Sequence, residues 1–186
     1  MIGYAICGSF CTHRQSLAAL RHLLDGGADV QPIVSETAAT TDTRFGKAAD
    51  LLQTLTKMTG RPPIITIKEA EPLGPAIPLE SLIIAPCTGN TLAKMAHGIT
   101  DSAVCMAAKA HIRCARPLLI ALATNDAMSA NLANLATVMQ RKNVYFVPLL
   151  QDDPVGKPFS LVADFSLLPA AFSAMHENRQ LRPLFR

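Results

Sequence analysis

Small and hydroxyl-bearing residues directly follow two apolar segments of the chain. Residues 86–91, Pro-Cys-Thr-Gly-Asn-Thr, come after the apolar run 82–85, and residues 7–11, Cys-Gly-Ser-Phe-Cys, come after the first apolar segment. A buried strand that ends in such residues and leads into a helix brings several backbone N–H groups to one point, which suits a phosphate. Two such strand ends in one chain predict a bound nucleotide-type cofactor.

Alternating strands and helices must position these turns. Strands are predicted at residues 2–7, 29–34, 64–67, 82–85, 117–122 and 144–147, with apolar residues at helical spacing between them. Strands that alternate with helices form a parallel sheet covered on both faces. We therefore predict an α/β fold, a three-layer Rossmann-like sandwich with a six-stranded parallel sheet. Ligands of such folds bind beyond the carboxyl ends of the strands, where both turns lie.

The amino-acid composition limits the classes of protein to which the chain can belong. Apolar residues make up 49% of the 186 residues and charged residues 17%, which indicates a large core or surface covered by other subunits. No apolar run reaches the roughly 20 residues that span a bilayer, so we expect a cytoplasmic protein. The high apolar content predicts a homo-oligomer. The net charge of +3 and the absence of tryptophan argue against nucleic-acid binding. We expect one domain over residues 1–186, with residues 160–186 packed on it or on a neighbouring subunit.

The cysteines and histidines suggest no metal site. The five cysteines have no C-x-x-C spacing, which predicts neither a zinc site nor a disulfide framework. Cys11 and His13 at the start of the first helix allow a catalytic thiolate. No third orienting group accompanies them, so we expect a buried thiol beside a surface histidine.

Short segments distributed along nearly the whole chain carry a further signal. They are residues 8–12, 40–46, 85–91, 106–110, 124–127, 145–148, 151–154 and 157–163. In their order and spacing these segments resemble the flavoprotein family of homo-oligomeric FMN-binding cysteine decarboxylases and flavin prenyltransferases. The resemblance implies FMN as the cofactor and assembly into trimers or dodecamers.

The resemblance also implies which residues form the site. The cofactor-binding residues that it implies are Gly8, Ser9, Phe10, Ser35, Thr88, Gly89, Asn90, Thr91 and Ala123. Residues 122–128 resemble a family motif that contacts substrate and flavin, which implies substrate binding by Asn125 and Met128. Arg44 and Lys109 are further candidates, because a cation complements a carboxylate. For Arg44 a solvent-facing loop position is an equal alternative, and no catalytic residue is implied.

Within the family, the resemblance implies a subunit that forms pyridine-2,6-dicarboxylate from a cyclic lysine-pathway intermediate during sporulation. A separate nicotinamide-dependent subunit is its implied partner, and the lack of G-x-G-x-x-G here places NAD(P) on that partner. The decarboxylases carry a histidine after the second strand, where residues 34–37 are Val-Ser-Glu-Thr. The prenyltransferases carry charged side chains where residues 123–125 are neutral. Two alternatives remain: a stand-alone FMN-dependent decarboxylase or prenyltransferase, and a non-catalytic subunit that binds and organises its partner.

Overall fold

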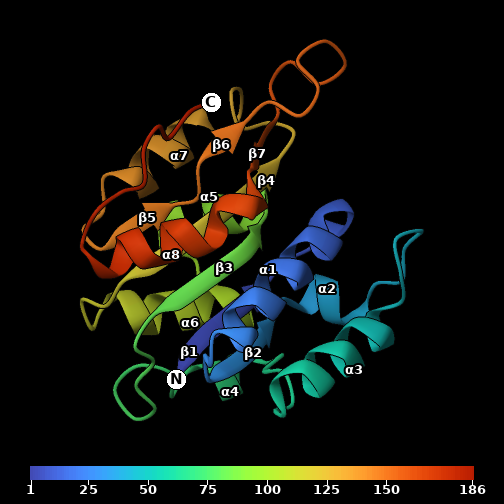
Figure 1. Ribbon diagram of the computed structural model, residues 1–186, viewed down its shortest axis with the longest axis vertical. Helices are drawn as coiled ribbons and strands as arrows, with labels where there is room; N and C mark the ends of the chain where they lie inside the picture. The colour runs from blue at the N-terminus through green and yellow to red at the C-terminus, as the bar shows by residue number, and fades with distance from the viewer.

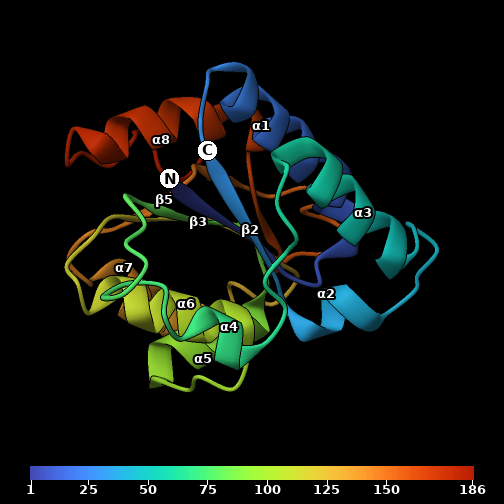
Figure 2. The same ribbon diagram turned by 90° about the horizontal axis from the view of Figure 1, so that it is seen from below.

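The computed structural model describes residues 1–186 as three layers, with a sheet between two layers of helices (Figures 1 and 2). Figure 2 shows α1, α3 and α8 over one face of the sheet and α4, α5, α6 and α7 over the other. The helices are α1 (His13–Asp25), α2 (Glu36–Thr40), α3 (Ala48–Thr59), α4 (Ile67–Ala70), α5 (Gly89–His97), α6 (Ala103–Ile112), α7 (Leu132–Met139) and α8 (Leu168–His176), with short 3₁₀ turns η1 (Phe10–Thr12) and η2 (Phe165–Leu167).

Five parallel strands form the main sheet in the order β2-β1-β3-β4-β5. They are β1 (Ile2–Ile6), β2 (Val30–Val34), β3 (Leu82–Cys87), β4 (Leu118–Thr124) and β5 (Val144–Phe146). Two short antiparallel strands, β6 (Leu149–Leu150) and β7 (Leu161–Ala163), extend the sheet from the end of β4. The predicted α/β sandwich is thus confirmed, and β1, β2 and β3 end side by side at one edge.

Two details of the sheet differ from the prediction. The segment 64–67 contributes only one bridge, between Ile64 and Ile33. It turns into α4 instead, because the Thr66 hydroxyl accepts the Glu69 N–H at 3.2 Å and the Glu69 carboxylate accepts the Thr66 N–H at 3.1 Å. The pair β6 and β7 was not predicted, because strands of two and three residues carry no measurable alternation.

A continuous core holds the layers together. Forty-eight buried residues form one cluster, and every residue of β3 is buried. The C-terminal segment packs on this same domain: α8 contacts β4, β5 and α1, and the Leu149 N–H donates to the Leu184 carbonyl at 2.7 Å. None of the helices has the length and apolar character needed to cross a membrane.

Candidate cofactor site at the strand ends

The turns after β1 and β3 are bonded to each other. The Cys7 N–H donates to the Pro86 carbonyl at 3.1 Å, and the Thr91 hydroxyl donates to the Cys7 sulfur at 3.3 Å. Burial raises the pKa of the Cys7 thiol to about 12, so the sulfur is a neutral acceptor at pH 7. These bonds fix the start of α5 against the end of β1.

Thr88 begins α5 as its N-cap. Its hydroxyl oxygen accepts the Thr91 N–H at 3.2 Å and donates to the Thr91 hydroxyl oxygen at 3.1 Å. The first N–H groups of a helix have no partner within the helix, so Gly89 and Asn90 offer theirs beyond the end of β3. The N-terminus of α5 is therefore available to an anion.

Ser35, directly after β2, is the N-cap of α2, as Thr88 is the N-cap of α5. Its N–H donates to the Ile6 carbonyl at 2.9 Å, which ties it to β1. Its hydroxyl accepts the Ala38 N–H at 3.3 Å and so caps α2. Three adjacent strands thus each end in a hydroxyl residue or a glycine that opens a helix.

These ends enclose a cavity of about 290 Å³, which we call the strand-end cavity. No hydrophobic residue lines it; its lining residues are Gly8, Ser35, Glu36, Thr37, Thr88, Asn90, Thr91, Lys94, Asp101 and Ser102. Five of the nine predicted cofactor-binding residues are among them, namely Gly8, Ser35, Thr88, Asn90 and Thr91. The two predicted turns therefore face the same space.

The charges of the strand-end cavity are largely neutralised. Lys94, its only cation, pairs with Asp101 at 2.8 Å. That hydrogen bond raises the pKa of Lys94 and lowers the pKa of Asp101. Glu36 adds a further carboxylate. An anion bound here is consequently held by neutral N–H and O–H donors, as at other phosphate-binding helix N-termini.

The remaining predicted cofactor-binding residues do not line this cavity. Ser9 begins η1, and its carbonyl accepts the Thr12 N–H at 3.0 Å. The Phe10 side chain lines a different cavity, beside α1. Ala123 is buried in the sheet, where it pairs with Val162. Gly89 is the first residue of α5, directly after the N-cap Thr88.

A polar network at the end of β4 was missed by the sequence analysis. The Asp126 carboxylate accepts the Thr124 hydroxyl at 2.5 Å and the Asn131 amide at 2.9 Å. A Cβ added to Gly89 would lie 2.5 Å from the Thr124 hydroxyl oxygen and 2.6 Å from the Asn131 amide nitrogen, so α5 packs directly on this network. Asn125 lies between two of its members with an exposed side chain. The Thr-Asn-Asp sequence directly after a strand was the signal available.

The predicted substrate-binding residues do not converge in the isolated chain. The Met128 N–H donates to the Phe159 carbonyl at 3.0 Å, near the β6–β7 hairpin. Arg44 lies on the loop between α2 and α3, with its guanidinium 4.8 Å from the ring centre of Phe45. Lys109 is exposed on α6.

The prediction of a buried Cys11 thiol beside a surface His13 was wrong. Cys11 is exposed, whereas His13 is partly buried and bonds the Cys7 carbonyl through Nε2 at 2.8 Å. η1 turns the chain between them, so the thiol faces solvent and the imidazole faces the domain.

Comparisons with known proteins match this geometry. A model of the family described as Flavoprotein matches residues 1–179. The B subunit of dipicolinate synthase from Bacillus subtilis (strain 168) is 43% identical over 183 residues, which are 98% of this chain and 92% of that protein. The crystal structure of the B subunit of dipicolinate synthase from Bacillus halodurans is 39% identical, with a TM-score of 0.90, and the match covers 100% of this chain and 95% of that one.

A more distant structure shares the fold alone. Burkholderia xenovorans DmrB, solved in complex with FMN, is 18% identical with a TM-score of 0.70, and the match covers 95% of each chain.

Proposed function

This chain belongs to the Flavoprotein family, and from that membership we propose that it is the FMN-binding subunit of a dipicolinate synthase. The observation that carries the proposal is the strand-end cavity, whose neutral donors come from the ends of three adjacent strands. Identity of 43% along almost the whole chain to the B subunit of a dipicolinate synthase supports the specific assignment.

The strand-end cavity fits the tail of FMN. Its hydroxyl groups and the N-terminus of α5 suit a phosphate and a hydroxylated chain, and Gly8 keeps the opening beside Thr37 free of a side chain. The flavin ring needs apolar cover, which this cavity does not offer, so the ring extends beyond it. We therefore propose that a second copy of the chain completes the site in a homo-oligomer, a trimer or dodecamer.

In this proposal the chain's own residues bind the cofactor and orient the substrate. Thr88, Gly89 and Asn90 hold the phosphate, Ser35 and Thr91 hold the neighbouring hydroxyl groups, and the Asp126 network fixes the loop that presents Asn125. In the homo-oligomer, Asn125 of one copy donates its amide hydrogens to a carboxylate of the substrate that another copy binds. Bound FMN supplies two-electron redox chemistry.

The reaction we propose ends in pyridine-2,6-dicarboxylate. A cyclic dicarboxylate intermediate loses water and then two electrons and two protons to become aromatic, and the redox cofactors of the two subunits, FMN and NAD(P), would accept the electrons. The partner in this reaction is the other subunit of the synthase, which binds NAD(P) and which we call the dehydrogenase subunit.

The visible absorption spectrum of freshly purified protein, with and without the dehydrogenase subunit, tests this proposal. We expect flavin absorbance in the protein alone, and dipicolinate only when both kinds of subunit are present. Colourless protein that does not take up added FMN would contradict the proposal.

One observation favours a second candidate, a non-catalytic protein that organises the dehydrogenase subunit. No histidine lines the strand-end cavity, whose ionisable residues are Glu36, Lys94 and Asp101. Asn125→Ala separates the two candidates, because its side chain is exposed and its loss should not affect folding. Loss of turnover with an intact complex supports the FMN-binding enzyme, and loss of the complex supports the organising role.

A further inference from the structure

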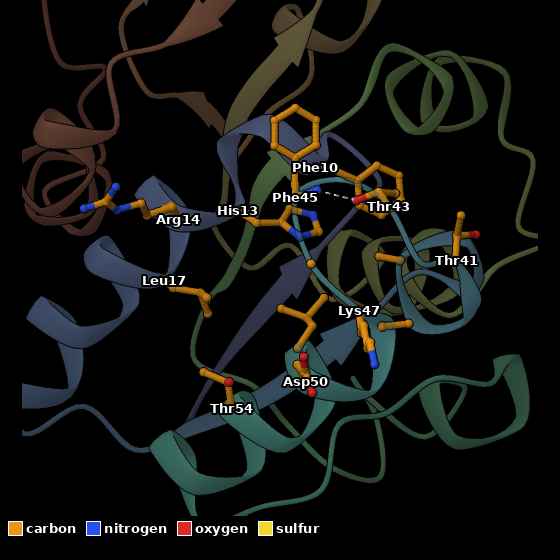
Figure 3. Close-up of a pocket in the computed structure, with 14 residues that line it drawn as sticks. Phe10, His13, Arg14, Leu17, Thr41, Thr43, Phe45, Lys47, Asp50 and Thr54 are labelled. Carbon is orange, nitrogen blue, oxygen red and sulfur yellow. Dashed lines mark hydrogen bonds between the residues drawn. The ribbon is translucent and has the colours of Figure 1, made fainter.

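A second cavity lies beside α1, and we call it the aromatic cavity. It measures about 390 Å³ and lies between α1, the loop 41–47 and the start of α3 (Figure 3). Phe10, Leu17, Phe45 and Leu51 give it an apolar lining. Apolar walls with a few polar groups are typical of pockets for small organic molecules.

His13 lies in the middle of this lining, among the other labelled side chains (Figure 3). Its Nε2 is 2.8 Å from the Cys7 carbonyl oxygen, which can only accept, so Nε2 carries the hydrogen. In the neutral ring Nδ1 is then an acceptor, and it has no partner in the chain. Burial lowers the pKa of His13, so the neutral form dominates at pH 7.

The charged residues of the aromatic cavity favour an anion. Figure 3 shows Arg14 and Lys47 on either side of His13, with the Arg14 guanidinium directed away from it, and neither residue forms an ion pair within the chain. Asp50 is the one carboxylate in the lining. Two unpaired cations on either side of an apolar wall complement a ring that carries two carboxylates.

We propose that the aromatic cavity binds a small cyclic dicarboxylate and that His13 Nδ1 takes a proton from its ring. The ring packs against Phe10 and Phe45, one carboxylate faces Lys47, and the exposed Arg14 side chain turns inward to meet the other. This inference rests on the proposed function and names the place where its substrate binds. The histidine that the decarboxylases carry after the second strand is absent here, and His13 supplies an imidazole from α1 instead.

The step assigned to His13 is the loss of water. Nδ1 removes a hydrogen from the ring carbon next to the one that bears the hydroxyl group. The electron pair of that C–H bond becomes the new double bond, and the hydroxyl group leaves with the C–O pair. The imidazolium returns its proton to the hydroxide, so the products are one alkene and one water, and no oxidant is needed. A neutral imidazole near pH 7 is well matched to such proton transfer.

The two cavities adjoin each other. A Cβ added to Gly8, which lines the strand-end cavity, would lie 3.4 Å from Thr37 and 3.6 Å from the Phe10 ring. Phe10 is thus the wall between them. A substrate in the aromatic cavity lies next to the cofactor site.

The binding claim is tested by isothermal titration calorimetry with pyridine-2,6-dicarboxylate on FMN-supplemented protein. We expect wild-type protein to bind, and Lys47→Met and Arg14→Met each to weaken binding about tenfold, the loss of one ionic contact. Arg113→Met is the matched control, because Arg113 is an exposed cation at the end of α6. No binding to wild-type protein, or equal binding by Lys47→Met and Arg113→Met, overturns the inference.

The role of His13 is tested in the complex with the dehydrogenase subunit. His13→Gln keeps a donor for the Cys7 carbonyl and removes Nδ1. We expect kcat to fall about a hundredfold, with affinity for pyridine-2,6-dicarboxylate within about threefold and an unchanged flavin spectrum. A kcat within about threefold of wild type, or an equal loss of affinity, refutes the role. Absence of flavin or of dipicolinate formation by wild-type protein refutes the proposed function instead, and the calorimetry still tests this site.

Discussion

The strand-end cavity and the aromatic cavity share α2 as a wall, yet they are built from different parts of the chain. The first is lined by the ends of parallel strands and by the N-terminus of α5, with its one cation already paired. The second is lined by side chains of α1, α3 and a loop, with two cations unpaired. The difference indicates a division of work: the backbone holds a cofactor tail in one cavity, and side chains recognise a substrate in the other.

Gly89→Val should have the largest effect and should weaken FMN binding more than dicarboxylate binding. The added side chain would collide with Thr124 and Asn131, because even a Cβ lies 2.5 Å from one and 2.6 Å from the other. Overpacking of this kind costs about 1–3 kcal/mol. We expect α5 to shift and FMN affinity to fall at least about tenfold, since about 1.4 kcal/mol corresponds to a factor of ten.

Urea unfolding and FMN titration followed by absorbance measure these effects. Gly8→Ala is the comparison, because its Cβ would make only ordinary contacts at 3.4 Å. Binding of pyridine-2,6-dicarboxylate should fall less than FMN binding in Gly89→Val, because the variant disturbs the Asp126 network beside Asn125 but leaves Arg14 and Lys47 unchanged. If that binding is lost together with FMN binding, the two cavities are not independent.

Phe45→Ala should have the opposite effect, weakening dicarboxylate binding and leaving FMN binding unchanged. The Phe45 side chain is 54% exposed, so its removal should change the free energy of unfolding by less than about 0.5 kcal/mol. Stacking of aromatic rings contributes about 0.5–1.5 kcal/mol, so we expect dicarboxylate binding to weaken about fivefold. FMN affinity should not change.

Phe159→Ala provides the matched control for Phe45→Ala. Phe159 is equally exposed, at 53%, but lies on the loop between β6 and β7. Isothermal titration calorimetry with pyridine-2,6-dicarboxylate compares the affinity of the two variants. Equal loss of dicarboxylate binding in the two would remove Phe45 from the site.

The same contrast explains what the sequence could predict. Periodic apolar segments predict the sandwich, because each strand and helix must bury one face. Hydroxyl residues and glycines directly after strands predict the strand-end cavity, because parallel strands end together. Gly8 and Thr88 are therefore recognisable from local order, whereas Ser35 was implied by the family resemblance.

The aromatic cavity and the orientation of His13 could not be predicted in this way. Phe10 and Phe45 are far apart in the sequence, and they line one cavity only because the loop 41–47 folds back beside α1. His13 resembled a surface residue, since nothing local indicates that η1 turns it toward the Cys7 carbonyl. Long-range packing, which local patterns do not encode, determines both.

Thr88→Val tests how much of the strand-end cavity depends on side chains. It removes the N-cap of α5, which costs about 1 kcal/mol of the free energy of unfolding. FMN affinity should fall about fivefold, because the first turn of α5 loosens. Thr37→Val is the matched control, since Thr37 lines the same cavity with a hydroxyl that bonds nothing in the chain. Equal effects of the two variants on the urea midpoint would argue against a capping role.

The smallest expected effect is the pH dependence of stability, which distinguishes the cavities by the histidine that only the aromatic one contains. Burial lowers the pKa of His13 and of His111 below the ordinary 6.5. The unfolded chain therefore takes up these protons first, so stability is full above about pH 6.5 and falls as pH decreases through the folded pKa values. We expect a lower urea midpoint near about pH 5 than near about pH 7.5.

His13→Gln should reduce this pH dependence, because it removes the imidazole whose pKa is lowered by burial. His13→Gln retains the bond to the Cys7 carbonyl, so the comparison isolates the proton on the imidazole from the packing of the side chain. What remains in His13→Gln belongs to His111, whose Nε2 bonds the Pro117 carbonyl at 2.8 Å and whose buried Nδ1 has no partner. A pH dependence that is the same in wild-type protein and His13→Gln would mean that burial does not lower the pKa of His13, and it would argue against the neutral imidazole proposed for the aromatic cavity.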